Sequence, residues 1–139
     1  MSTARLLTAL SLAICASTTL AAPAAPLALD HSSATLMDKP TALALWQDSF
    51  SPKLIKLYPV ARWGYASEVE GGFDDAKVCI VTARAMMLPR SGKTLVFQPA
   101  KTATVFGLQA GASMDQCRAL SKAKLADAIA ALHAALVPR

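Results

Sequence analysis

The chain has 139 residues, with 14 Lys or Arg, 9 Asp or Glu and 2 His, which give a formal net charge of +5. This length leaves room for a single domain. The charge is mild, the basic residues are scattered and few aromatic residues lie among them, so the composition does not indicate a nucleic-acid partner.

The N-terminal segment has the three parts of a secretory signal peptide. Arg5 supplies a positive charge, residues 6–16 are an apolar run, and small residues lead to Ala21. We therefore expect residues 1–21 to be removed on export to a bacterial periplasm or to the medium. Cys15 leaves lipidation open as an alternative to release of a soluble protein. No later apolar run is long enough to span a membrane, so no transmembrane segment is predicted in the mature chain.

The domain is predicted to open with a pair of helices. Residues 22–36, rich in Pro, Ala and Ser, are expected to be a flexible leader, and residues 37–139 a single compact α+β domain. Asp38 suits a helix N-cap, and apolar residues then recur at helical spacing as far as Phe50. Ser51, followed by a proline, is expected to begin a second, shorter helix.

After residue 60 the apolar residues follow the alternation of β-strands. The expected strands are residues 62–69, 77–88, 93–98 and 101–106. Residues 107–112 are expected to form a loop, and Gly71 with Gly72 either a bulge or the hairpin turn itself.

The strand at residues 77–88 is expected to be central in the sheet. Alternate residues from Cys79 to Met87 are apolar, and small in the middle, which predicts a buried face that a helix can approach closely. Ser113 and Gln116 form a capping-box pair at the start of the longest helical pattern, which runs to about residue 136. Cys117 lies on the apolar stripe of that helix and is expected to face Cys79.

Cys79 and Cys117, the cysteines left after export, are therefore predicted to form a disulfide. The bridge would close a loop of nearly forty residues and contribute about 3–4 kcal/mol in the chain-entropy model. The predicted fold is α+β: an antiparallel three- to four-stranded meander covered on one face by a long C-terminal helix and an N-terminal helical pair, and cross-linked by one disulfide.

Two surfaces are candidate binding sites. The first is the turn between the central strand and the next one, with a rigid proline, adaptable methionine and two cations. Its proposed partner-binding residues are Met86, Leu88, Pro89, Arg90 and Lys93. The second is an acidic hairpin that could dock a basic protein. Its carboxylates are Glu68, Glu70, Asp74 and Asp75, with Lys77 or Arg84 as cross-strand partners.

The sequence predicts no catalytic residue, metal site or cofactor. His31 lies in the leader, and His133 falls on the flank of the last helix, where we expect an exposed surface side chain. Neither has the neighbours of a nucleophilic triad or of a zinc site. Glu68 and Glu70 share one face of a strand and leave a small hydrolase as an alternative.

The leading functional hypothesis is a non-enzymatic exported binding protein with a protein partner. In its most specific form it is an inhibitor or immunity-type protein that binds an envelope-acting enzyme or effector. A periplasmic carrier of a small molecule or lipid is the alternative from another class, with its ligand between sheet and helices. The oligomeric state is left open.

Overall fold

The computed structural model describes residues 25–138. The expected signal peptide, with Cys15, lies outside this range. The described chain contains three helices and five strands, which confirms the α+β class. Their bounds are β1 Ala28–Asp30, α1 Lys39–Ser49, α2 Pro52–Leu57, β2 Trp63–Phe73, β3 Val78–Ser91, β4 Thr94–Leu95, β5 Lys101–Ala110 and α3 Met114–Leu136. None of the helices described is both long enough and apolar enough to cross a bilayer.

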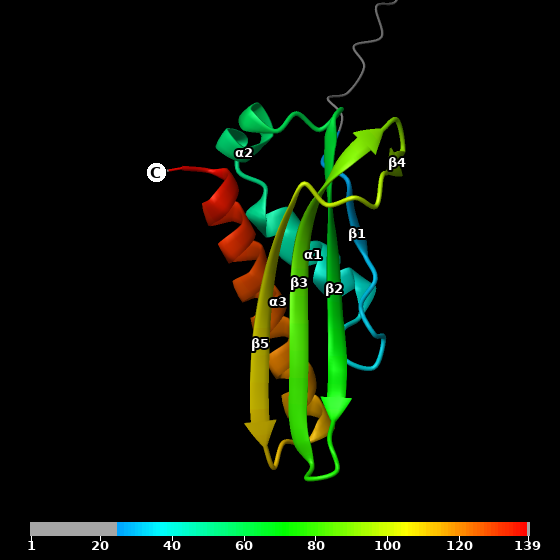
Figure 1. The fold of residues 1–139 in the computed structure, drawn as a ribbon, viewed down its shortest axis with the longest axis vertical. Coiled ribbons are helices and arrows are strands. Elements are labelled where there is room, and N and C mark those ends of the chain that lie inside the picture. The colour runs from blue at the N-terminus through cyan, green and yellow to red at the C-terminus, as the bar shows by residue number, and fades with distance from the viewer. Residues whose placement is uncertain (1–24, 139) are drawn as a thin grey trace, which may run out of the picture.

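The strands form a curved, mostly antiparallel sheet (Figure 1). β3 is central and pairs antiparallel with β2 on one side and β5 on the other. β1 extends the sheet beyond β2 as a parallel strand, and β4 pairs only with the last residues of β3. Within the part of the chain that the structure describes, β5 pairs with β3 alone and is an edge strand of the sheet.

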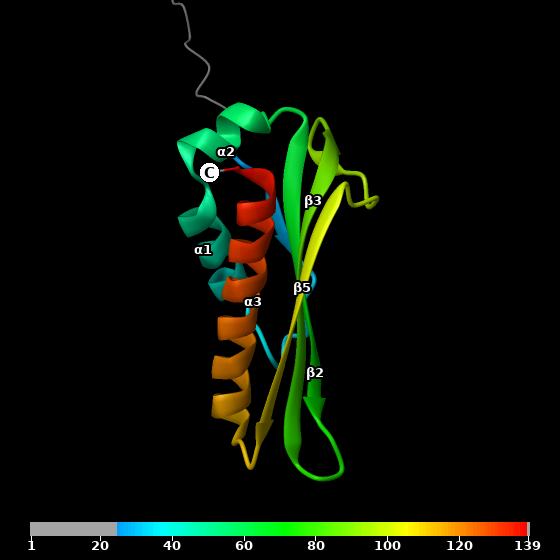
Figure 2. The ribbon, with the colours of Figure 1, turned by 60° about the vertical axis from the view of Figure 1, so that its left-hand side comes forward.

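Two helices, α1 and α3, lie against one face of the sheet (Figure 2), here called the inner face. Inward-pointing residues of β3 such as Val81 and Ala83 are fully buried beneath α3, which contributes Leu125 and Leu132 to the same core. No helix of residues 25–138 covers the opposite, outer face. Among these residues, the β4 hairpin folds over the upper part of it.

The inner face is built from small residues so that α3 can come close. On β5, a Cβ at Gly107 would lie 2.8 Å from Lys124 Cγ and 3.1 Å from Leu120 Cδ1. Ala83 and Ala85 continue this shallow surface along β3, and Ala103 on β5 lies opposite Ala85. The bulky residues of β5 are therefore left on the outer face, because side chains alternate along a strand.

The predicted disulfide between Cys79 and Cys117 is present. It joins the start of β3 to the first turn of α3, with a Cα–Cα distance of 5.7 Å and both cysteines fully buried. Sheet and C-terminal helix are thus linked covalently at the end of the molecule where α3 begins.

The helices begin at the predicted caps. The Asp38 carboxylate accepts the N–H of Thr41 at 2.9 Å and its hydroxyl at 2.8 Å, and these hydrogen bonds hold the pKa of Asp38 below its ordinary value. Ser51 caps α2, and Ser113 with Gln116 forms the complete capping box at the start of α3. These local signals need no tertiary contact, which is why they can be read from the sequence.

The segment expected to be a flexible leader, residues 22–36, enters the fold within its described part. β1 pairs with β2, and beyond it the N–H of His31 donates to Ser67 and that of Ser33 to Val69, both at 2.9 Å. Leu36 is buried. The unpaired edge of β2 offers hydrogen bonds that composition alone does not reveal.

Three strand boundaries differ from the prediction. Gly71 and Gly72 form neither a bulge nor the turn, because both lie in the regular β2–β3 ladder and the turn follows at residues 74–77. β5 continues to Ala110, through the residues expected as a loop. The strand expected at 93–98 is reduced to the two residues of β4.

Candidate functional site

The turn that the sequence singled out is partly covered. Met86 and Leu88, two of the proposed partner-binding residues, are 3% and 0% exposed. They pack with Ala66 beneath Leu95 of the β4 hairpin and form a small second core on the outer face. These two side chains are therefore not on the surface, because the hairpin that follows them folds back over the sheet.

The other residues of this turn have separate roles. Arg90 donates from Nε to the Gly92 carbonyl at 2.6 Å and from Nη1 to the Val60 carbonyl at 2.8 Å, so it holds two loops together. The Pro89 carbonyl accepts the N–H of Val96 at 2.9 Å. Lys93 is exposed near the tip of the hairpin. Of the five predicted residues, Lys93 alone presents an exposed side chain.

The acidic residues occupy two neighbouring places. Glu68 and Glu70 lie on the outer face of β2, and Arg84 on β3 donates to Glu68 at 2.8 Å, one of the two cross-strand pairings expected. Asp74 and Asp75 lie in the turn between β2 and β3, where Asp74 accepts the N–H of Val78 at 2.7 Å. Within residues 25–138, no group of three His, Cys, Asp or Glu side chains is placed to hold a metal ion.

The most exposed large apolar side chains of the described chain lie on the lower half of the outer face, below the β4 hairpin. Phe106 and Leu108 on β5 are each 70% exposed, and Ile80 on β3, the cross-strand partner of Leu108, is 39% exposed. These three residues are called the outer apolar patch. Exposed large side chains are common singly, but three adjacent ones on a bare sheet mark a candidate interaction site.

Polar side chains border this patch on one side. The register places Glu70, Thr82 and Phe106 in one row across the outer face. The next row contains the Glu68–Arg84 ion pair and, on β5, Thr104. An apolar centre with a polar rim is the usual arrangement of a protein–protein interface.

The sequence analysis missed this patch because it ended the last strand at Phe106. A signal was present: from Ala103 to Leu108, small residues alternate with larger ones, except at Val105. Ala83 and Ala85 lie on the face of β3 that the helices cover, and the small residues of β5 lie on the same face of the sheet. Phe106 and Leu108 must then point away from the helices.

Ser51 and His133 form a polar pair that the sequence analysis also missed, since they lie 82 residues apart. Ser51 Oγ accepts the Leu54 N–H at 3.1 Å and is hydrogen-bonded to His133 Nε2, also at 3.1 Å. His133 is half-buried rather than exposed as expected. Pro52 has no N–H to stabilise an oxyanion, so the geometry suits a helix cap tied to α3 better than a nucleophile.

Comparison with models of protein families, with curated protein sequences and with solved structures finds no match to this chain in any of the three.

Proposed function

We propose that the protein is a non-enzymatic binding protein that recognises another protein through the outer apolar patch and the adjoining edge of β5. The observation that carries the proposal is the exposure of Phe106 and Leu108, each 70% open to solvent on the same face of one strand. A partner that covered them would gain about 25 cal/mol for each Å² of apolar surface removed from water.

The chemistry of the patch suits recognition by a protein. Aromatic side chains in the centre of an interface often supply most of its binding energy, and Phe106 has the size and position of such an anchor. Its neighbours Glu70 and Thr82 can hydrogen-bond at the rim. Along the free edge of β5, backbone groups that do not face β3 can pair with an extended segment of the partner. Lys101 is the only charge on β5, and the strand contains no proline that would block such pairing.

In its most specific form, the proposal is an exported inhibitor or immunity-type protein that binds an envelope-acting enzyme or effector. The expected signal peptide motivates export, and a structural disulfide is consistent with an oxidising compartment. A cross-linked domain loses little conformational entropy on docking, which favours tight inhibition. Glu70 lies on β2, and Asp74 and Asp75 lie in the turn that follows it. Their carboxylates favour a partner with a basic surface.

The carrier alternative has one observation in its favour. A surface hollow of about 470 Å³ lies between α1, the start of α2 and α3, lined by Leu45, Ile129 and the Ser51–His133 pair among others. Its volume is in the range of small-ligand sites. The hollow lies at a helix–helix seam and not between sheet and helices. No observation favours the hydrolase alternative, since Arg84 forms an ion pair with Glu68, one of the two carboxylates that it requires.

The first experiment is a co-purification. The full-length gene, tagged at the C-terminus, is expressed in the native host, and whatever elutes in stoichiometric amount is identified, with the intact mass of the protein itself recorded. We expect a single protein partner. Replacing Phe106 and Leu108 by Ser should weaken its binding by about 30-fold or more, the size of effect typical of a hot-spot residue.

The matched control replaces Val96 and Phe97 by Ser. These apolar side chains are also exposed, at 46% and 59%, but lie outside the patch. Binding should survive in this variant. If the control loses the partner and the patch variant keeps it, the surface is misassigned. A bound small molecule seen by native mass spectrometry of the eluted protein, with no protein partner, would replace the proposal by the carrier.

A further inference from the structure

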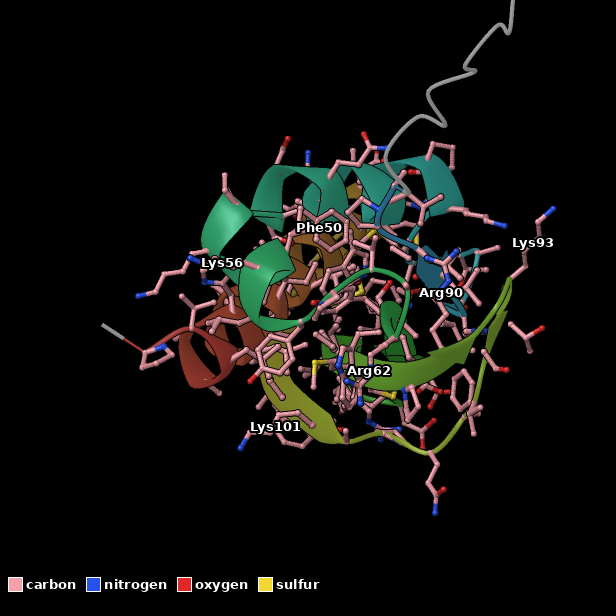
Figure 3. The ribbon with its side chains drawn as sticks, turned by 90° about the horizontal axis from the view of Figure 1, so that it is seen from above. Phe50, Lys56, Arg62, Arg90, Lys93 and Lys101 are labelled. Atoms are coloured by element: carbon pink, nitrogen blue, oxygen red, sulfur yellow. A yellow bond between two sulfur atoms is a disulfide. The ribbon has the colours of Figure 1, made fainter. Side chains whose placement is uncertain are left out.

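One end of the molecule gathers cationic side chains from four separate segments. Figure 3 looks down on this end, which is opposite the β2–β3 turn. We call it the basic end. It contains the labelled residues Lys56 on α2, Arg62 before β2, Arg90 and Lys93 around the β3–β4 turn, and Lys101 at the start of β5.

These charges are not neutralised by neighbours within the described chain. The ion pairs of residues 25–138 join Arg84 to Glu68, Arg118 to Asp115 and Lys124 to Asp127, and none includes a member of the basic end. From Ala76 to Met114 the sequence contains no Asp or Glu.

Four of the nine carboxylates lie toward the opposite end, where Lys77 is also in the turn. Glu70 lies near the end of β2, Asp74 and Asp75 in the turn that follows it, and Asp115 in the first turn of α3. An elongated domain with opposite charges at its two ends is oriented by an electric field, including that of a charged surface.

Apolar and aromatic side chains lie among the cations. Leu57 and Val96 are 48% and 46% exposed, and the hydrogen bond from Val96 to the Pro89 carbonyl fixes it at this end. Tyr58 and Trp63 are half-buried and pack edge to face, with ring centroids 6.1 Å apart. Aromatic rings beside Lys and Arg are the composition that proteins present to the headgroup region of a bilayer.

The chain that precedes the described residues joins the fold at this same end. The Leu27 carbonyl accepts the N–H of Tyr65 near the start of β2, and β1 runs from there parallel to β2, away from the basic end. The 24 residues before Ala25, including the apolar run at 6–16, are therefore attached beside the cations.

We propose that the basic end docks on an anionic membrane surface, with the lipid headgroup phosphates as the ligands of its Lys and Arg side chains. The cations supply attraction, and Leu57, Val96 and the Tyr58–Trp63 pair contact the headgroup boundary. Docked in this way, the long axis stands away from the bilayer, and the outer apolar patch is held clear of the lipid for a partner. The basic end and the outer apolar patch have no residue in common, so either proposal can fail alone.

The test is sedimentation with vesicles. The full chain, with its N-terminus read by intact mass, is mixed with vesicles of phosphatidylethanolamine and phosphatidylglycerol, and separately with phosphatidylcholine vesicles. We expect stronger binding to the anionic vesicles, and a steep loss when ionic strength is raised. Replacing Lys93 and Lys101 by Glu should weaken anionic binding by about 25-fold or more, since each such cation contributes about a fivefold factor.

The matched control replaces Lys39 and Lys122 by Glu, an equal change in net charge outside the basic end. It should bind anionic vesicles within about threefold of the unaltered chain. Equal binding to neutral and anionic vesicles would overturn the proposal, as would an equal loss in both double variants. Binding to an acidic polypeptide but to neither vesicle would also overturn it and assign the end to a protein. The Phe106 and Leu108 variant should retain vesicle binding.

Discussion

Tyr65 lies near the start of β2 with its side chain 3% exposed, between the rings of Trp46 and Phe50 at centroid distances of 5.2 Å. Burial raises the pKa of the Tyr65 hydroxyl to about 12, and the nearby Tyr58 adds to the shift. The unfolded chain ionises at about pH 10, so the folded state binds this proton more tightly. This contribution to stability is present below pH 10 and is lost as the pH rises toward 12.

We expect Tyr65→Phe to reduce the alkaline loss of stability, because phenylalanine has no proton to lose. The free energy of unfolding from urea titrations at neutral pH and at about pH 11 should fall less in the variant, by about 1 kcal/mol. Tyr58→Phe is the matched control and should keep most of the loss. Parallel pH profiles for Tyr65→Phe and the unaltered chain would contradict the assignment.

A second residue in this cluster is less well satisfied. The Trp46 side chain is 1% exposed, and its indole Nε1 has no hydrogen-bond partner among the described residues. An unpaired buried donor costs about 1–3 kcal/mol. The apolar packing of Trp46 against Phe50 and Tyr65 offsets that penalty.

At the scale of the elements, the β2–β3 pair depends on a glycine. Gly71 has φ of +138°, and a Cβ there would collide with the carbonyl oxygen of Ile80 on the paired strand. Gly72 has a similar φ of +150° but open space around it. A side chain at either position would therefore strain the backbone, but only at Gly71 would it also collide with the paired strand.

Gly71→Ala should lower the free energy of unfolding by about 3 kcal/mol or more, because the carbonyl cannot move without breaking the ladder. Gly72→Ala should lower it by about 1–2 kcal/mol from strain alone. Urea unfolding of both variants measures the difference. Equal losses would show that the backbone conformation, and not the collision, decides the need for glycine at position 71.

Local signals predicted the elements more reliably than their ends. The N-caps at Asp38, Ser51 and Ser113 fix helix starts through hydrogen bonds within one turn, so the sequence alone locates them. β1 could not be found in this way, because three residues become a strand only when β2 offers them an edge. The length of β5 could not be predicted either, since Gly107 and Gly111 are typical of a loop. The close approach of α3, which explains the glycine at position 107, is known only from the structure.

The candidate site illustrates the same limit. Arg84 was one of two predicted cross-strand partners, and the ion pair to Glu68 is present because both lie at matching positions of adjacent strands. Burial of Met86 and Leu88 could not be predicted, since it depends on the direction in which the next hairpin folds. To predict the outer apolar patch, one must know which side chains of β5 face the helices. That depends on which face of the sheet the helices cover.

At the scale of the whole molecule, the disulfide joins the two layers. Cys79 belongs to the sheet and Cys117 to the helix that covers it, 38 residues later. Replacing both by Ala should lower the free energy of unfolding by about 3–4 kcal/mol in the chain-entropy model. Urea unfolding measures this loss, and the unaltered chain in reductant should show a similar shift of the midpoint. An unchanged midpoint in both samples would contradict a structural role.

The same bridge constrains how β5 can meet another molecule. β5 lies between Cys79 and Cys117 in sequence, inside a covalent ring whose other members are the rest of β3, β4 and their turns. Two oxidised copies cannot exchange β5 as a swapped element, because the strand cannot leave a closed ring. A backbone cut between residues 80 and 116 would likewise leave both pieces joined. A partner that binds the edge of β5 can therefore cover the strand or add a strand beside it. It cannot pull β5 out of its own domain.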